Sequence, residues 1–244
     1  MANYASVNNV YSRLRVLLNK QQLGFVTPSQ FNQLASQAQQ NIFLRLIDLL
    51  NDSNKSKLRG LETANRDIER SVEEDLSTLL IYRQSLSPQT GTTDLFDYPQ
   101  YHAYTRSIEY NNKALSIVRP QDSTYFRNNR YAPTPTWAIA ILGNNEIEII
   151  PDTISDNIRI TYFKTPMGSI DGVQSNQTPT WGYAVVGEDE VYASANSVDF
   201  ELPKHLESKI TDEIMSLMGI SLREDDVIKY AELQQQKEMT RTNG

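Results

Sequence analysis

The change from helices to strands is clearest in residues 134–151, which read TPTWAIAILGNNEIEIIP. Large apolar side chains occupy alternate positions before and after Gly143-Asn144-Asn145, which is the pattern of half-buried strands. A Gly-Asn-Asn segment between two such runs is typical of a hairpin turn. This stretch therefore predicts two antiparallel strands joined at residues 143–145.

A similar stretch follows 44 residues later (178 − 134 = 44), where residues 178–191 read TPTWGYAVVGEDEV. Seven of its 14 positions are identical to those of residues 134–147. We expect the same hairpin to be used twice, with proline ending a loop, tryptophan anchoring a strand and glycine forming the turn. Two copies are too few for a solenoid, which needs at least about three repeats.

The two-residue period runs through much of residues 84–202. Ile158, Ile160 and Tyr162 alternate with other residues in the same way, and nine of the ten prolines lie between Pro88 and Pro203. Short alternating runs separated by turn residues indicate strands. We therefore expect a β-rich module with long loops over 84–202.

Residues 1–83 show the helical period instead. One apolar stripe consists of Val7, Val10, Tyr11, Leu14 and Leu18. The segment Thr27-Pro28-Ser29-Gln30 predicts a capping box with proline in the first turn, so a second helix should begin there and reach about Leu50. We expect a polar turn over 51–56 and a third helix from about Lys57.

Residues 203–244 return to the helical period. Leu206, Ile210, Ile214 and Leu217 form one stripe, and Gly219 is predicted to end that helix. The sequence thus predicts an α+β fold. It should have an N-terminal helical hairpin or bundle over 1–83, a central antiparallel β module over 84–202, and a C-terminal helix with an extended helical tail over 203–244.

The C-terminal tail is one candidate contact surface. Its residues are only weakly amphipathic, which is typical of a segment that becomes ordered against a partner or of a helix that frays. The predicted partner-docking residues are Val227, Ile228, Tyr230 and Leu233.

A second candidate surface is the loop that follows Arg119. It interleaves aromatic and arginine residues, which are enriched at protein interfaces. The predicted interface residues are Tyr125, Phe126, Arg127, Arg130 and Tyr131. Stacking on single-stranded nucleic acid is the alternative interpretation of this loop.

Residues that could form a catalytic or metal site are few. The chain has no cysteine and two histidines, which excludes thiolate chemistry and cysteine-ligated zinc. Neither His102 nor His205 has a second histidine or a paired carboxylate at the spacing of a metal site. No nucleophile elbow, phosphate loop or dinucleotide-binding motif occurs. We predict no catalytic residues, no metal, no cofactor and no enzymatic activity.

The charge of the chain limits its partners. The net charge is −7, and tight binding to phosphate groups needs lysine and arginine. DNA is therefore expected to slide past this protein rather than to be gripped by it. No segment approaches the ~20 apolar residues of a membrane span, and the first residues lack the pattern of a signal peptide. We expect synthesis in the cytoplasm and no membrane partner.

Three stretches together resemble the connector ring (adaptor) proteins of podovirus-type tailed bacteriophages, especially those of crAss-like phages. The first is residues 10–32, which contain LLNKQQLGFVTP at 17–28. The second is residues 146–166, with EIEIIP and then IRITYFKTP, and the third is residues 197–220, which begin SVDFELP. The resemblance spans most of the chain, and none of its stretches is a catalytic signature.

The resemblance implies a structural virion protein of the phage neck or tail. It implies a homo-oligomeric ring below the portal protein, with about twelve copies matching the symmetry of the portal. The ring would pass genomic DNA through its centre during DNA ejection, without sequence-specific binding. The C-terminal tail would dock on the portal, and the β-rich part would face adjacent connector or tail proteins during tail assembly.

Two other functions remain open. One is a receptor- or carbohydrate-binding module of the phage tail, for which exposed aromatic residues would suit sugar stacking. Helical regions at both ends of the chain argue against a tail fibre. The other is a wall-degrading hydrolase that uses a pair of carboxylates, although no pair stands out in the sequence.

Overall fold

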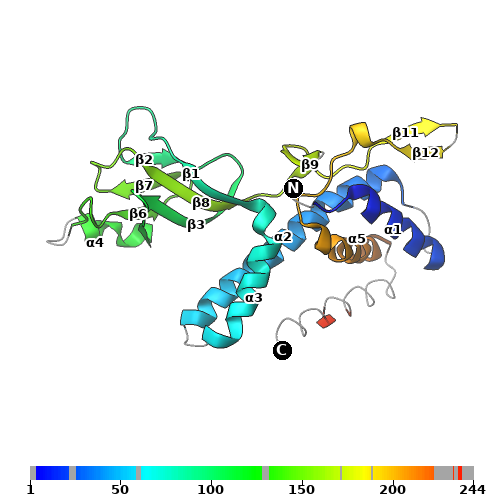
Figure 1. Cartoon of the computed structure of the whole chain (residues 1–244), viewed down its shortest axis with the longest axis horizontal. Helices are drawn as coiled ribbons and strands as arrows, with labels where there is room; N and C mark the ends of the chain where they lie inside the picture. The colour runs from blue at the N-terminus through cyan, green and yellow to red at the C-terminus, as the bar shows by residue number, and fades with distance from the viewer. Residues whose placement is uncertain are drawn as a thin grey trace. The chain divides into compact units, whose positions relative to one another are not determined.

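The computed structural model describes residues 4–21, 26–58, 62–127, 132–170, 172–187, 189–222, 233 and 236–237. The fold is α+β, as predicted, with helices before and after a β-rich middle (Figure 1). It divides into two compact units, one formed by Met1–Leu79 with Pro166–Gly244 and the other by Leu80–Thr165. Among the described residues we find no helix that combines the length and the apolar composition of a membrane span.

The first unit begins with three helices: α1 (Val7–Gln21), α2 (Pro28–Leu58) and α3 (Glu62–Asp75). The predicted stripe of α1 is buried throughout. The predicted capping box at the start of α2 is confirmed, because the backbone N–H of Thr27 donates to Gln30 Oε1 and the N–H of Gln30 donates to Thr27 Oγ1. Proline therefore opens α2, as its fixed φ allows.

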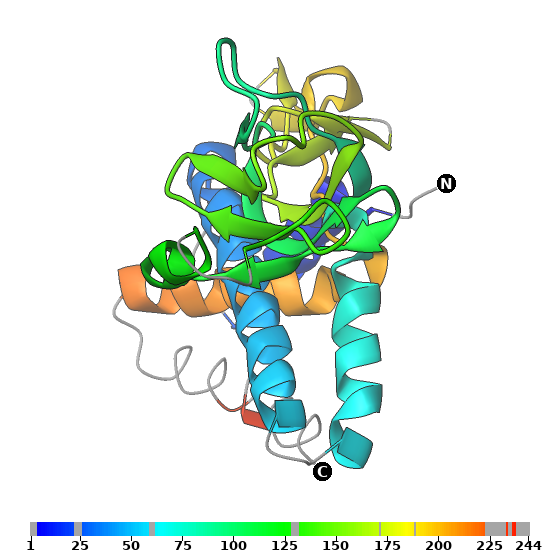
Figure 2. The same ribbon diagram turned by 90° about the vertical axis from the view of Figure 1, so that its left-hand side faces the viewer.

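The predicted turn over 51–56 is wrong. Helix α2 continues through it as one helix of 31 residues, and the predicted start of a third helix at Lys57 falls inside α2. The next helix, α3, lies beside the second half of α2 (Figure 2). Packing against α3 stabilises a stretch whose polar composition alone indicates a turn, since tertiary contacts override weak local preferences.

The chain returns to this unit at Pro166 and adds two hairpins and a helix. These elements are β9 (Gly168–Ile170), β10 (Val173–Ser175), β11 (Tyr183–Val186), β12 (Asp189–Tyr192), and α5 (Glu207–Leu222), which follows the 3-10 turn Lys204–Leu206. The predicted end of the last helix at Gly219 is wrong, because α5 reaches Leu222. Its buried face, with Ile214 and Met218, runs up to this buried glycine, and a helix tolerates one interior glycine at a cost of about 1 kcal/mol.

The second unit consists of two four-stranded sheets, with the strand orders β1-β8-β3-β4 and β2-β7-β6-β5. Their elements are β1 (Leu80–Ser85), β2 (Leu95–Asp97), β3 (His102–Tyr110), β4 (Lys113–Ala114), β5 (Ser116–Val118), a short helix α4 (Ser123–Arg127), β6 (Ile139–Leu142), β7 (Glu146–Ile150) and β8 (Ile158–Lys164). Pairing is antiparallel except between β5 and β6. The predicted hairpin turn is confirmed, because the N–H of Gly143 donates to the carbonyl oxygen of Glu146.

A shared apolar core joins these two sheets. Ile108 and Ile160 come from one sheet, and Phe96 and Ile147 come from the other. Strand β6 contributes Ala140 to this core, whereas Ile139 and Ile141 are buried on the opposite face of the strand. The predicted alternation is therefore present, but both faces of this strand are buried.

The boundaries of the units, at 79/80 and 165/166, differ from the expected zones 1–83, 84–202 and 203–244. The two-residue period of residues 166–202 predicts that they belong to the β module. In the structure they belong with the helices, since side chains of this segment are buried against α1 and α2. Local periodicity reports the type of an element and not the partner on which it packs.

Candidate functional site

The feature of the first unit with the clearest capacity to bind a partner is the hairpin β11–β12, whose base is fixed by Trp181. Only 3% of the Trp181 surface is exposed. Its ring lies 4.4 Å from that of Tyr11 on α1, which lies 4.8 Å from the ring of Phe31 on α2. The indole Nε1–H donates to Asn8 Oδ1 at 3.1 Å. Three aromatic rings and one hydrogen bond thus attach the hairpin to the helices.

The backbone at Trp181 is fixed as well. Its N–H donates to Asn32 Oδ1 at 2.7 Å, and Asn32 Nδ2 donates to its carbonyl oxygen at 3.4 Å. The amide side chain of Asn32 therefore pairs with Trp181 as a neighbouring strand would. The next residue must be Gly182, because a Cβ there would lie 2.4 Å from the carbonyl oxygen of Asn196.

Tyr11 is a structural donor in this arrangement. Its hydroxyl donates to the carbonyl oxygen of Val26 at 3.1 Å. Burial raises the pKa of Tyr11; the positive charge of Arg15 opposes this effect, and the negative charge of Glu190 on β12 adds to it. The neutral phenol is thus favoured, as a buried hydrogen-bond donor requires.

Beyond its base, the hairpin is exposed. Val185 and Val186 are 68% and 64% exposed, and Tyr183 and Val191 are exposed as well. β11 and β12 pair with each other and form a sheet of two strands. Exposed apolar side chains on both faces of a fixed hairpin favour contact with another protein.

Two buried carboxylates on α5 hold the first unit together. Glu207 Oε1 accepts hydrogen bonds from the N–H of Ser6 and from Asn9 Nδ2, and Glu207 Oε2 lies 3.4 Å from Arg13. Glu213 accepts a hydrogen bond from Asn41 Nδ2 at 2.8 Å. Its two oxygens also lie 3.1 and 2.7 Å from Arg45 on α2. These carboxylates join α1 and α2 to α5, so their oxygens are engaged in structural bonds.

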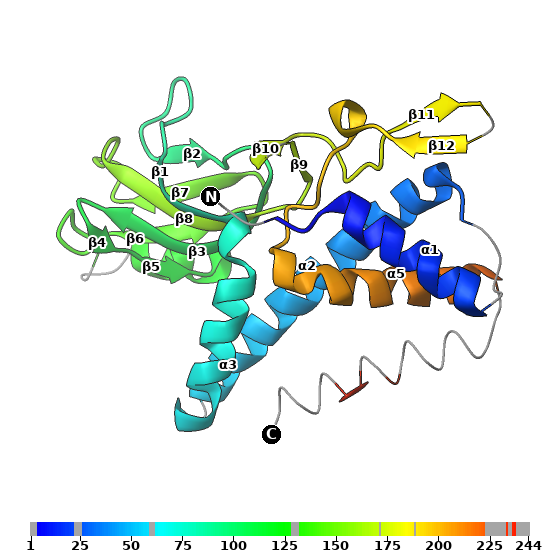
Figure 3. The same ribbon diagram turned by 45° about the vertical axis from the view of Figure 1, so that its right-hand side comes forward.

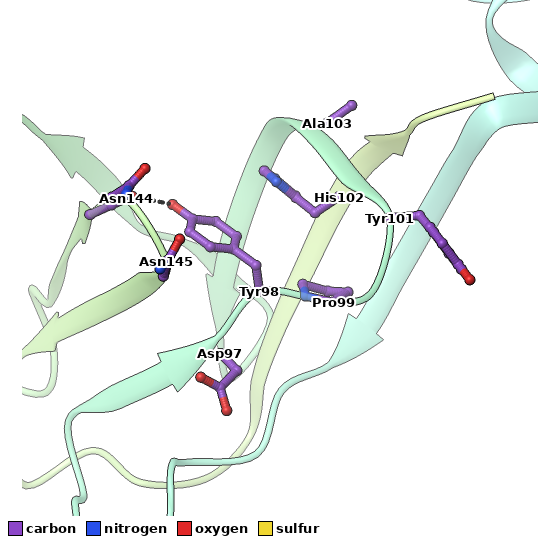
Figure 4. Close-up of a pocket in the computed structure, with 9 residues that line it drawn as sticks. Asp97, Tyr98, Pro99, Tyr101, His102, Ala103, Asn144 and Asn145 are labelled. Atoms are coloured by element: carbon purple, nitrogen blue, oxygen red, sulfur yellow. Dashed lines mark hydrogen bonds between the residues drawn. The ribbon is translucent and has the colours of Figure 1, made fainter. Parts of the chain in front are cut away.

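A polar pocket of about 660 Å³ lies in the second unit. Asp97, Tyr98, His102, Asn144 and Asn145 line it, and the ring of Tyr98 lies between His102 and the two asparagines of the turn (Figure 4). The His102 ring stacks on Tyr98 at 4.4 Å, and its Nε2 lies 2.8 Å from Thr105 Oγ1. Burial lowers the pKa of His102, so this imidazole favours its neutral form.

The predicted interface loop lies on the second unit. Tyr125, Phe126 and Arg127 are in α4, where the Phe126 ring contacts Trp137 edge-on at 6.4 Å. Tyr125 is exposed, and Arg127 forms an ion pair with Glu148 on β7. The structure thus brings three of the five predicted residues together. The other two, Arg130 and Tyr131, lie outside the described residues.

The predicted docking tail is described at one position. Leu233 is helical and exposed. The other predicted docking residues, Val227, Ile228 and Tyr230, lie outside the described residues.

Each TPTW stretch is followed by a hairpin whose first strand begins two residues after the tryptophan. The burial of the two tryptophans differs, however. Trp137 is 47% exposed, whereas Trp181 is buried. None of the candidate site residues predicted from the sequence lies in the hairpin β11–β12. The signal that could have found it is the pair Val185-Val186, because adjacent valines in a short strand put an apolar side chain on each face.

Within the described part of the chain, no three histidine, aspartate or glutamate side chains are grouped to hold a metal ion. No protein-family model matches the sequence, and no curated protein matches it.

Proposed function

We propose that this chain is a structural protein that forms a ring of the head-to-tail connector of a tailed bacteriophage. The observation that carries the proposal is the hairpin β11–β12, which Trp181 fixes to the helical unit while Val185 and Val186 remain exposed. Exposed valines on a fixed element favour contact with another protein. The three connector-like stretches of the sequence favour a phage neck or tail as the place of that contact.

The buried carboxylates support a structural rather than a catalytic role. General acids and bases need a carboxylate that can reach a substrate. Glu207 and Glu213 instead bind backbone, asparagine and arginine groups between helices. Their arrangement stabilises the relative positions of α1, α2 and α5, as a structural role requires.

In the assembled connector the ring has about twelve copies and lies below the portal, whose symmetry it follows. The C-terminal residues that include Leu233 dock on the portal, and exposed aromatic residues such as Tyr125 face the adjacent connector or tail protein. Genomic DNA passes through the centre. The net charge of −7 favours sliding over binding, because fixed phosphate contacts need a basic surface.

Electron microscopy of the purified full chain, alone and mixed with the portal protein of the same phage, tests this proposal. The expected result is a closed ring with a central channel, either in free solution or on the portal. Native mass spectrometry of the same samples gives the copy number. A chain that stays monomeric in both samples would refute the proposal, and a strongly basic channel would refute the sliding mechanism.

The pocket of the second unit favours a second candidate function, a carbohydrate-binding module of the phage tail. Tyr98 offers an aromatic ring, and Asp97, Asn144 and Asn145 offer polar groups of the kind that bind sugar hydroxyls. Titration calorimetry with oligosaccharides from the host surface separates the two functions. Binding that is lost in Tyr98→Ala and retained in Tyr125→Ala would favour the carbohydrate-binding module.

A further inference from the structure

We draw no further inference here: the strongest candidate, the apolar groove of the first unit that residues of α1 and α5 line around the exposed Val16 (both helices are labelled in Figure 3), carries none, because nothing in the structure shows what covers it.

Discussion

The side chain of Gln39 closes a cycle of hydrogen bonds with Glu201. Gln39 Oε1 accepts a hydrogen bond from the N–H of Glu201, and Gln39 Nε2 donates one to the carbonyl oxygen of Met167, both at 2.8 Å. Glu201 Oε2 accepts a hydrogen bond from the N–H of Met167 at 2.7 Å. The side-chain amide of Gln39 on α2 thus binds two segments of the chain. One contains Met167, where the chain re-enters the first unit, and the other contains Glu201 and leads into α5.

Replacing this amide should destabilise the first unit. Gln39→Ala removes two hydrogen bonds and leaves the N–H of Glu201 and the carbonyl of Met167 without that partner. We expect the free energy of unfolding to fall by about 2–4 kcal/mol, since each unsatisfied buried group costs about 1–3 kcal/mol. Urea unfolding followed by circular dichroism measures the change. Gln40→Ala, at an exposed position of the same helix, is the control and should stay within about 0.5 kcal/mol.

The two tryptophans of the repeated stretch should respond differently to the same substitution. Trp181→Phe removes the hydrogen bond to Asn8 and leaves space beside Tyr11, which should cost about 1–3 kcal/mol. Trp137→Phe should cost less than about 1 kcal/mol, because that ring is half exposed and contacts Phe126 at its edge. If urea unfolding shows that both variants lose the same free energy of unfolding, the assignment of Trp181 as the anchor of the hairpin is contradicted.

These two residues also indicate what the sequence can predict. Both hairpins follow from their identical TPTW stretches and glycine turns, because strand period and turn residues are local signals. The burial of Trp181 is not local, since it depends on Asn8, Tyr11 and Asn32, which lie about 150 residues or more earlier in the chain. One sequence without aligned relatives contains no signal for that pairing.

The same distinction explains the errors at helix ends. The capping box was predictable because Thr27 and Gln30, three positions apart, satisfy each other's hydrogen-bonding groups. The continuation of α2 through 51–56 was not predictable, since its polar residues are helical in the presence of α3. The exposure of the hairpin β11–β12 is not predictable for a related reason: valines in a strand predict burial, and only the fold leaves Val185 and Val186 exposed.

The ion pair between Arg45 and Glu213 should contribute to stability mainly through the buried carboxylate. Arg45→Met leaves the buried carboxylate of Glu213 without its cationic partner and should cost about 1–3 kcal/mol, whereas Glu213→Gln should cost less, because the Arg45 side chain is 46% exposed and stays hydrated. A double-mutant cycle measured by urea unfolding isolates the coupling of the two residues. Coupling indistinguishable from zero would contradict a structural role for this pair.

Acidification should destabilise the second unit through His102. Burial lowers the pKa of this imidazole in the folded protein, so the unfolded chain, with an ordinary value near about 6.5, takes up the proton first. The contribution of His102 is complete above about pH 6.5 and is lost as the pH falls from there toward the folded pKa. Carboxylates titrate lower, near about pH 4, so the window to measure is about pH 5–7.5.

Two variants identify the residue that causes this pH dependence of stability, because the chain has two histidines. The free energy of unfolding of His102→Gln should depend less on pH across that window than that of the wild type. His205→Gln should retain the part due to His102, since His205 is mostly exposed and pairs with Asp75 in the first unit. In an NMR titration of the folded wild type, the imidazole signal lost in His102→Gln should have a midpoint below about 6.5. A midpoint above that value would reverse the sign, and stability would then rise on acidification through this residue.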